Sequence, residues 1–196
     1  MAERQAGRAR RLIIGAFALG VLGLSGGLVL ALAAPQIPSP LASSMISVRE
    51  ARSDALAHAL APADLDRALT EAHAALKLSP AAATVWLRVA DLETRKAGGL
   101  TPAALEALER SYEAAPLGPD VTLWRLTFLF ERWRDLPAPL RQKAIAELSA
   151  RSKTRARSSD DFADTIQDPA GRLAARMAVR IALREKHPNS ANSVIQ

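Results

Sequence analysis

Cysteine is absent from this 196-residue sequence, and aromatic residues are few: four Phe, three Trp and one Tyr. Without cysteine the chain has no disulfide, no thiolate metal ligand and no cysteine nucleophile. β-branched residues are also sparse, which disfavours strands, whereas the abundant Ala, Leu, Arg and Glu lose little conformational freedom in helices. The composition therefore predicts an all-α protein.

Charged residues are missing from residues 12–48 and are unevenly distributed elsewhere. Residues 1–11 carry four Arg and one Glu, and residues 151–196 carry nine Lys or Arg and five Asp or Glu. Residues 49–150 are nearly neutral, so the positive charge belongs to the two ends of the chain. A nucleic-acid binder more often spreads positive charge over its folded face, and we expect no nucleic-acid partner.

Residues 12–34 form an uncharged, mostly apolar run. A helix of this length, rising about 1.5 Å per residue, reaches roughly 34 Å, enough to cross a hydrocarbon core of about 30 Å. The positive-inside rule places the basic segment 1–11 in the cytoplasm, because the first charge after the run is Arg49. The Ala and Arg bias is typical of a GC-rich bacterial genome. We therefore expect a single transmembrane helix in a bacterial inner membrane, with the rest of the chain in the periplasm.

A cleaved signal peptide is the alternative interpretation of this run. Ala31-Leu32-Ala33 fits a small-x-small cleavage site. The run is longer than the about 7–15 residues usual for the apolar part of a signal peptide, which favours an uncleaved anchor. The uncharged, Pro- and Ser-containing segment 35–47 then predicts an extended spacer between the anchor and the folded domain.

One face of the expected anchor helix carries the small residues Ala16, Gly20, Gly23 and Gly27. Such a face lets two membrane helices approach closely, so these residues are candidates for a helix–helix contact and for a homo-oligomer formed through the anchor. The simpler explanation is that glycine is common in membrane helices.

Residues 48–150 show helical periodicity with clear helix boundaries. We expect one helix at 62–78 and another at 102–115, where Thr101 is the N-cap and Pro102 the first helical residue, after a Gly98-Gly99 turn. A looser pair of helices is expected to begin near Asp120 and near Pro137.

Small, bulky and proline residues recur in this region at fixed spacings. The series are Ala68, Ala72, Ala75 and Pro80; Trp86, Val89, Ala90 and Glu93; and Ala104, Leu108, Ser111 and Pro116. They resemble degenerate tetratricopeptide repeats, in which Trp86 packs as a buried aromatic between the two helices of its repeat. Glu93 departs from the pattern where the repeat has an aromatic residue, as does Ala72 where it has a large one. The resemblance implies an antiparallel helical-repeat domain at 48–150, and an ordinary helical bundle is the alternative.

A second resemblance rests on Leu123-Trp124-Arg125-Leu126 and on Trp133-Arg134-Asp135-Leu136-Pro137. These stretches are similar to polysaccharide-biosynthesis membrane proteins of the VpsP type. The resemblance implies a role in exopolysaccharide assembly or export and carries no catalytic motif.

The C-terminal region 151–196 predicts a basic loop, a helix and a tail. Arg151, Lys153, Arg155 and Arg157 lie in a Ser-rich stretch that we expect to be a loop. A final helix is expected from Asp168-Pro169, with Leu173, Met177 and Ile181 on one side. Another side carries the candidate contacts for an anionic partner: Arg172, Arg176, Arg180 and Arg184. These arginines either solvate the helix or bind an anionic lipid, polymer or protein.

Motifs for catalysis and for metal binding are missing from the sequence. His58, His73 and His187 have no second ligand at metal-binding spacing, and no phosphate loop or nucleophile elbow occurs in the soluble region. We therefore expect no catalytic residue, no metal site, no cofactor and no enzymatic activity.

Two functions fit these observations. The first is a membrane-anchored periplasmic scaffold or adaptor that binds an envelope protein in its repeat groove, near Trp86 or Trp124. The alternative is an electrostatic module whose basic C-terminal helix docks on an anionic polymer or lipid.

Overall fold

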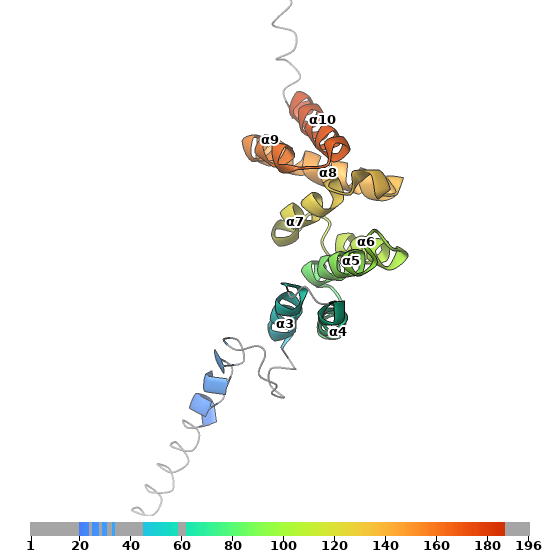
Figure 1. Ribbon diagram of the computed structural model, residues 1–196. Coiled ribbons are helices and arrows are strands. Elements are labelled where there is room, and N and C mark those ends of the chain that lie inside the picture. Colours follow the sequence, from blue (N-terminus) through green and yellow to red (C-terminus); the bar gives the residue numbers. More distant parts are fainter. Residues whose placement is uncertain are drawn as a thin grey trace, which may run out of the picture. The chain divides into compact units, whose positions relative to one another are not determined.

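The computed structural model describes residues 20–23, 25–27, 29–30, 33, 45–58 and 62–186, and among these no residue lies in a strand. From Ile46 onward the elements are α3 (Ile46–His58), α4 (Pro62–Leu78), α5 (Ala83–Ala97), α6 (Pro102–Ala114), α7 (Pro119–Phe130), η1 (Trp133–Asp135), α8 (Ala138–Thr154), α9 (Ala156–Thr165) and α10 (Pro169–Lys186), as Figure 1 shows. The expected all-α class is confirmed.

The expected anchor lies mostly outside the described residues. Those that are described, at 20–23, 25–27, 29–30 and 33, are helical and exposed. Among the residues that the structure describes, no helix has both the length and the apolar character to cross a membrane. Ala16 lies outside the described residues, and a Cβ added at Gly20, Gly23 or Gly27 would meet nothing within 4 Å. The anchor and its helix–helix contact therefore stay predictions.

The chain divides into two compact units, and the first ends at Pro80. It contains the hairpin of α3 and α4, whose helices lie side by side. Ala68, Ala72 and Ala75 on α4 are fully buried. Their small size lets the helices approach, and the Ser53 hydroxyl on α3 donates to the carbonyl of Ala68 at 3.0 Å. Arg49 and Glu71 form an ion pair across the hairpin at 3.1 Å.

The second unit, Ala81–Gln196, begins with the hairpin of α5 and α6. Gly98 ends α5 in the left-handed conformation, with φ 71°, which favours glycine because it has no Cβ. The Thr101 hydroxyl accepts from the backbone N–H of Ala104 at 3.1 Å, and Pro102 is the first residue of α6. The turn and the cap that the sequence predicts are both confirmed.

Helices α7 to α10 complete the second unit. Helix α10 packs against α7, α8 and α9, and also contacts η1. Phe130 at the end of α7 stacks on Trp133, with ring centroids 5.0 Å apart, and meets the edge of Phe162 from α9. The end of α7, η1 and α9 thus share one aromatic cluster.

Two sequence predictions about local structure are wrong. The stretch containing Arg151 and Arg157 is not a loop, because α8 extends to Thr154 and α9 begins at Ala156. Trp86 is half-buried rather than a core aromatic, since Leu87 and the neighbouring apolar residues of α5 fill the core positions of that helix.

Candidate functional site

The start of α10 is fixed by two carboxylates. Asp168 caps the helix, because its Oδ2 atom accepts from the backbone N–H of Gly171 at 2.6 Å. Glu131, just after α7, accepts from the backbone N–H groups of Gln167 at 2.6 Å and Asp168 at 3.0 Å. The expected helix start at Asp168-Pro169 is confirmed, and α10 is tied to the end of α7.

The buried side of α10 is made of small residues. They are Gly171, Ala175, Ala178, Val179 and Ala182. The approach is closest at the glycine, since a Cβ there would lie 1.8 Å from the carbonyl oxygen of Phe130. Large side chains do not fit on this side of the helix.

Leu173, Met177 and Ile181 consequently point outward, with 61%, 54% and 53% of their surface exposed. Arg176, Arg180 and Arg184 are exposed as well. The sequence predicted apolar residues on one side and arginines on another. The two series do form separate rows, but both rows lie on the half of the helix that faces away from the small residues.

The four candidate arginines differ in their exposure and in their partners. Arg172 is half-buried, and its Nε atom donates to the carbonyl of Ile166 at 2.6 Å. Arg176 pairs with Asp164 of α9 through Nε at 3.0 Å and Nη2 at 2.7 Å. Within the described part of the chain, no carboxylate pairs with Arg180 or Arg184. We define the outer face of α10 as Leu173, Met177, Ile181, Arg176, Arg180 and Arg184.

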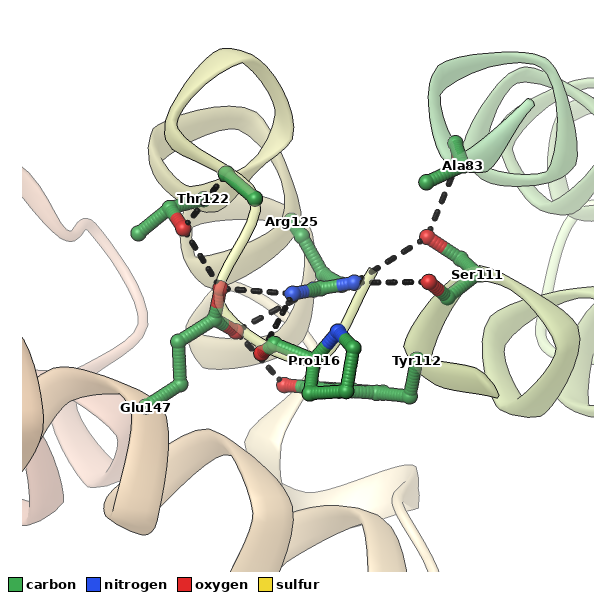
Figure 2. Close-up of polar contacts among 8 residues, drawn as sticks. Ala83, Ser111, Tyr112, Pro116, Thr122, Arg125 and Glu147 are labelled. Carbon is green, nitrogen blue, oxygen red and sulfur yellow. Dashed lines mark hydrogen bonds and ion pairs between the residues drawn. The ribbon is translucent and has the colours of Figure 1, made fainter. Parts of the chain in front are cut away.

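A buried ion pair joins α7 to α8 and was not predicted from the sequence. The Arg125 guanidinium lies between the Glu147 carboxylate and Ser111, as Figure 2 shows. Both charged side chains are almost fully buried, at 0% and 1% exposure, and the Nη2 to Oε1 distance is 2.7 Å. The available signal was a single arginine in the apolar sequence that follows the first turn of α7, since a lone arginine among buried residues needs a partner.

Every N–H of Arg125 has an acceptor. Nε and Nη2 donate to Glu147 at 3.1 and 2.7 Å, and Nη2 also donates to the carbonyl of Pro116 at 3.0 Å. Nη1 donates to the carbonyl and the hydroxyl oxygen of Ser111 at 3.0 and 3.3 Å. Glu147 in turn accepts from Tyr112 at 2.9 Å and from Thr122 at 2.7 Å. All hydrogen-bonding groups of the pair are thus satisfied, and the buried ion pair links α6, α7 and α8.

Tyr112 is the titratable group most affected by this network. Burial raises the pKa of its hydroxyl well above the usual value, and the neighbouring Glu147 carboxylate raises it further. The Arg125 guanidinium lies over the ring, 3.9 Å from its centroid, and opposes the shift. Tyr112 therefore stays neutral in the folded chain at physiological pH.

Raising the pH is expected to destabilise the fold through Tyr112. The unfolded chain releases the phenol proton near pH 10, whereas the folded chain keeps it. The contribution of Tyr112 to the free energy of unfolding is therefore fully present below pH 10 and falls above it. Because Tyr112 is the only tyrosine, tyrosinate absorbance reports this residue alone. We expect the absorbance to rise together with the loss of helical circular dichroism, and Tyr112→Phe to flatten the alkaline fall in thermal stability. Tyrosinate formation in the fully helical chain would contradict this.

A pocket of about 290 Å³ adjoins the buried pair between the start of α7 and the end of α8. Its lining includes Thr122, Glu147, Arg151 and Arg155. The only lining carboxylate is that of Glu147, which is already engaged by three partners. The pocket therefore presents no free acid or base. Over the residues described in the structure, no three His, Cys, Asp or Glu side chains gather in a way that could hold a metal ion.

Comparisons with protein-family models, with curated proteins and with solved structures found no match for this chain. The resemblances to tetratricopeptide repeats and to VpsP-type proteins therefore stay predictions.

Proposed function

We propose that this chain is a membrane-anchored scaffold or adaptor of the bacterial envelope, whose periplasmic helical domain binds a protein partner. The apolar run 12–34 behind a basic segment supports the anchor and its orientation. The resemblance to VpsP-type proteins favours a partner in exopolysaccharide assembly or export. The glycine face of the anchor allows a homo-oligomer.

The tetratricopeptide-like architecture is part of the proposal. In two of its series the residues before the closing proline are buried as packed repeats require, including Ala68, Ala75 and Ala104 at 0% exposure. Helices α3 with α4 and α5 with α6 form hairpins. Trp124, one of the expected groove contacts, is 36% exposed, and the Arg88 guanidinium lies 5.9 Å from the centroid of its ring.

The observation that carries the proposal is the outer face of α10. Three large apolar side chains, each more than half exposed, follow one another on a helix that is otherwise tightly packed. Isolated exposed apolar residues need no explanation, but a contiguous row of them marks a surface that binds a protein or a membrane. The groups of the buried network are all engaged, which favours binding over catalysis.

Site-specific crosslinking tests this function. A photoreactive amino acid at Met177 of the full chain in intact cells is expected to give a discrete crosslinked protein that co-sediments with membranes. The same amino acid at Glu106, an exposed residue of α6, is the matched control and is expected to give none. Identical products at the two positions, or no protein product at Met177, would count against a protein-binding face on α10.

The electrostatic module remains the second candidate, because Arg180 and Arg184 have no carboxylate partner among the described residues. In that case binding depends on charge alone and is lost as salt rises. The exposed apolar row argues against it, since a polyanion leaves Leu173, Met177 and Ile181 in water.

A further inference from the structure

We propose that the partner segment is an acidic amphipathic helix, which docks lengthwise on the outer face of α10. This inference rests on the proposed protein-binding function and deepens it by naming the chemistry of the partner. It is carried by the spacing of the exposed side chains, by the charges that lack partners and by the charges of the neighbouring helix.

The exposed side chains form two parallel rows. Leu173, Met177 and Ile181 are spaced by four residues, and so are Arg176, Arg180 and Arg184. Side chains at this spacing form ridges along a helix, and helices pack by placing a ridge of one into the groove between two ridges of the other. Each row rises about 12 Å along the axis, enough to meet about two turns of a partner helix.

The apolar row determines one face of the partner. Leu173, Met177 and Ile181 offer a narrow strip rather than a broad patch, because arginines border it on one side. A partner helix with apolar residues at every third and fourth position presents a strip of matching width. Docking then removes both apolar strips from water, which makes the free energy of binding favourable.

The arginine row determines the charge of the partner. Arg180 and Arg184 form no ion pair in the described part of the chain, since the nearby Glu185 pairs with Lys153, so a helix on the apolar row would cover them without a counter-charge. Covering an unpaired guanidinium is costly, whereas bidentate bonds to a carboxylate offset that cost. The partner is therefore expected to carry Asp or Glu beside its apolar strip.

Helix α9 argues against an anionic membrane as the occupant. It carries Asp160, Asp161 and Asp164, all exposed, and Asp164 is the residue that pairs with Arg176 of α10. A flat anionic bilayer on the outer face would also approach these carboxylates, and like charges repel. A single helix, about 10 Å wide, can follow the apolar row and leave α9 uncovered.

The test uses the full-length chain reconstituted in phosphatidylcholine nanodiscs and four probes. The first is a synthetic helical peptide with Leu at every third and fourth position and Glu beside the Leu strip. The second replaces each Glu by Lys, the third scrambles the first, and the fourth is vesicles of phosphatidylglycerol and phosphatidylcholine. Binding is measured for the natural chain, for Arg180→Glu/Arg184→Glu, and for the control Arg67→Glu/Arg110→Glu, which reverses two exposed arginines on α4 and α6.

The expected result is selective binding of the acidic helical peptide over the scrambled and basic ones. Reversing Arg180 and Arg184 should weaken that binding by at least about tenfold and transfer it to the basic peptide. The control variant should bind as the natural chain does. Circular dichroism of each variant checks that the helical fold is retained.

Three other outcomes overturn the inference. Equal binding of acidic and basic peptides, abolished only by Leu173→Ser/Met177→Ser/Ile181→Ser, leaves a protein-binding face without charge selection and keeps the proposed function. Binding of the vesicles alone overturns the inference and the proposed function together. No binding to any probe overturns the acidic helix, while crosslinking at Met177 still decides the proposed function.

Discussion

Arg125→Met is expected to destabilise the second unit by about 3–5 kcal/mol, because it leaves the Glu147 carboxylate buried without its counter-ion. Glu147 would keep its bonds from Tyr112 and Thr122, which do not neutralise the charge. All three tryptophans lie between Ala81 and Gln196, so tryptophan fluorescence in a urea titration reports on this unit alone. The measurement is the shift of the urea midpoint.

Two further variants separate the ion pair from general effects of losing an arginine. Arg110→Met removes an exposed arginine that pairs with Glu113 on its own helix, and it should cost at most about 1 kcal/mol. The double variant Arg125→Met/Glu147→Met should lose less than the sum of the two single variants, because neither charge is then left alone. If Arg125→Met lowered the urea midpoint no more than Arg110→Met does, the buried ion pair would not stabilise the fold.

Helix boundaries were the part of this fold that the sequence predicted best. Thr101, Pro102 and the Gly98-Gly99 turn act through their immediate neighbours, and Asp168 before Pro169 acts in the same way. Caps and turns satisfy backbone groups within one helical turn, so a local pattern is enough to place them.

The Ser-rich stretch after residue 150 shows where local patterns mislead. Serine and arginine there were interpreted as a solvated loop, but Ser152 and Ser159 are buried. Their hydroxyls donate to the carbonyls of Leu148 and Arg155, one turn earlier in the chain. Bonded to the helix backbone in this way, serine is accommodated inside α8 and α9.

The buried network and the orientation of α10 depend on contacts that sequence periodicity does not contain. Arg125 meets Glu147 and Ser111, which are 22 and 14 residues away. For α10, the apolar row of Leu173, Met177 and Ile181 was expected to define its own side of the helix. The structure instead buries the small residues, because the distance to the neighbouring backbone decides which side faces inward.

That close approach predicts an unfavourable effect of Gly171→Ala. Alanine favours a helix over glycine by about 1 kcal/mol, so propensity alone predicts a more stable α10. The added Cβ would lie 1.8 Å from the Phe130 carbonyl oxygen and 2.7 Å from its carbonyl carbon. These are backbone atoms, which cannot move aside as the end of a flexible side chain can. The end of α7 is also held by Glu131, which bonds to the backbone of Gln167 and Asp168.

We therefore expect Gly171→Ala to destabilise the second unit by about 3 kcal/mol, with the clash outweighing the gain in propensity. Gly99→Ala is the matched control, because a Cβ there meets nothing within 4 Å, and its urea midpoint should stay close to that of the natural chain. The sign of the effect is decisive, since a more stable Gly171→Ala would mean that α10 packs less closely on Phe130.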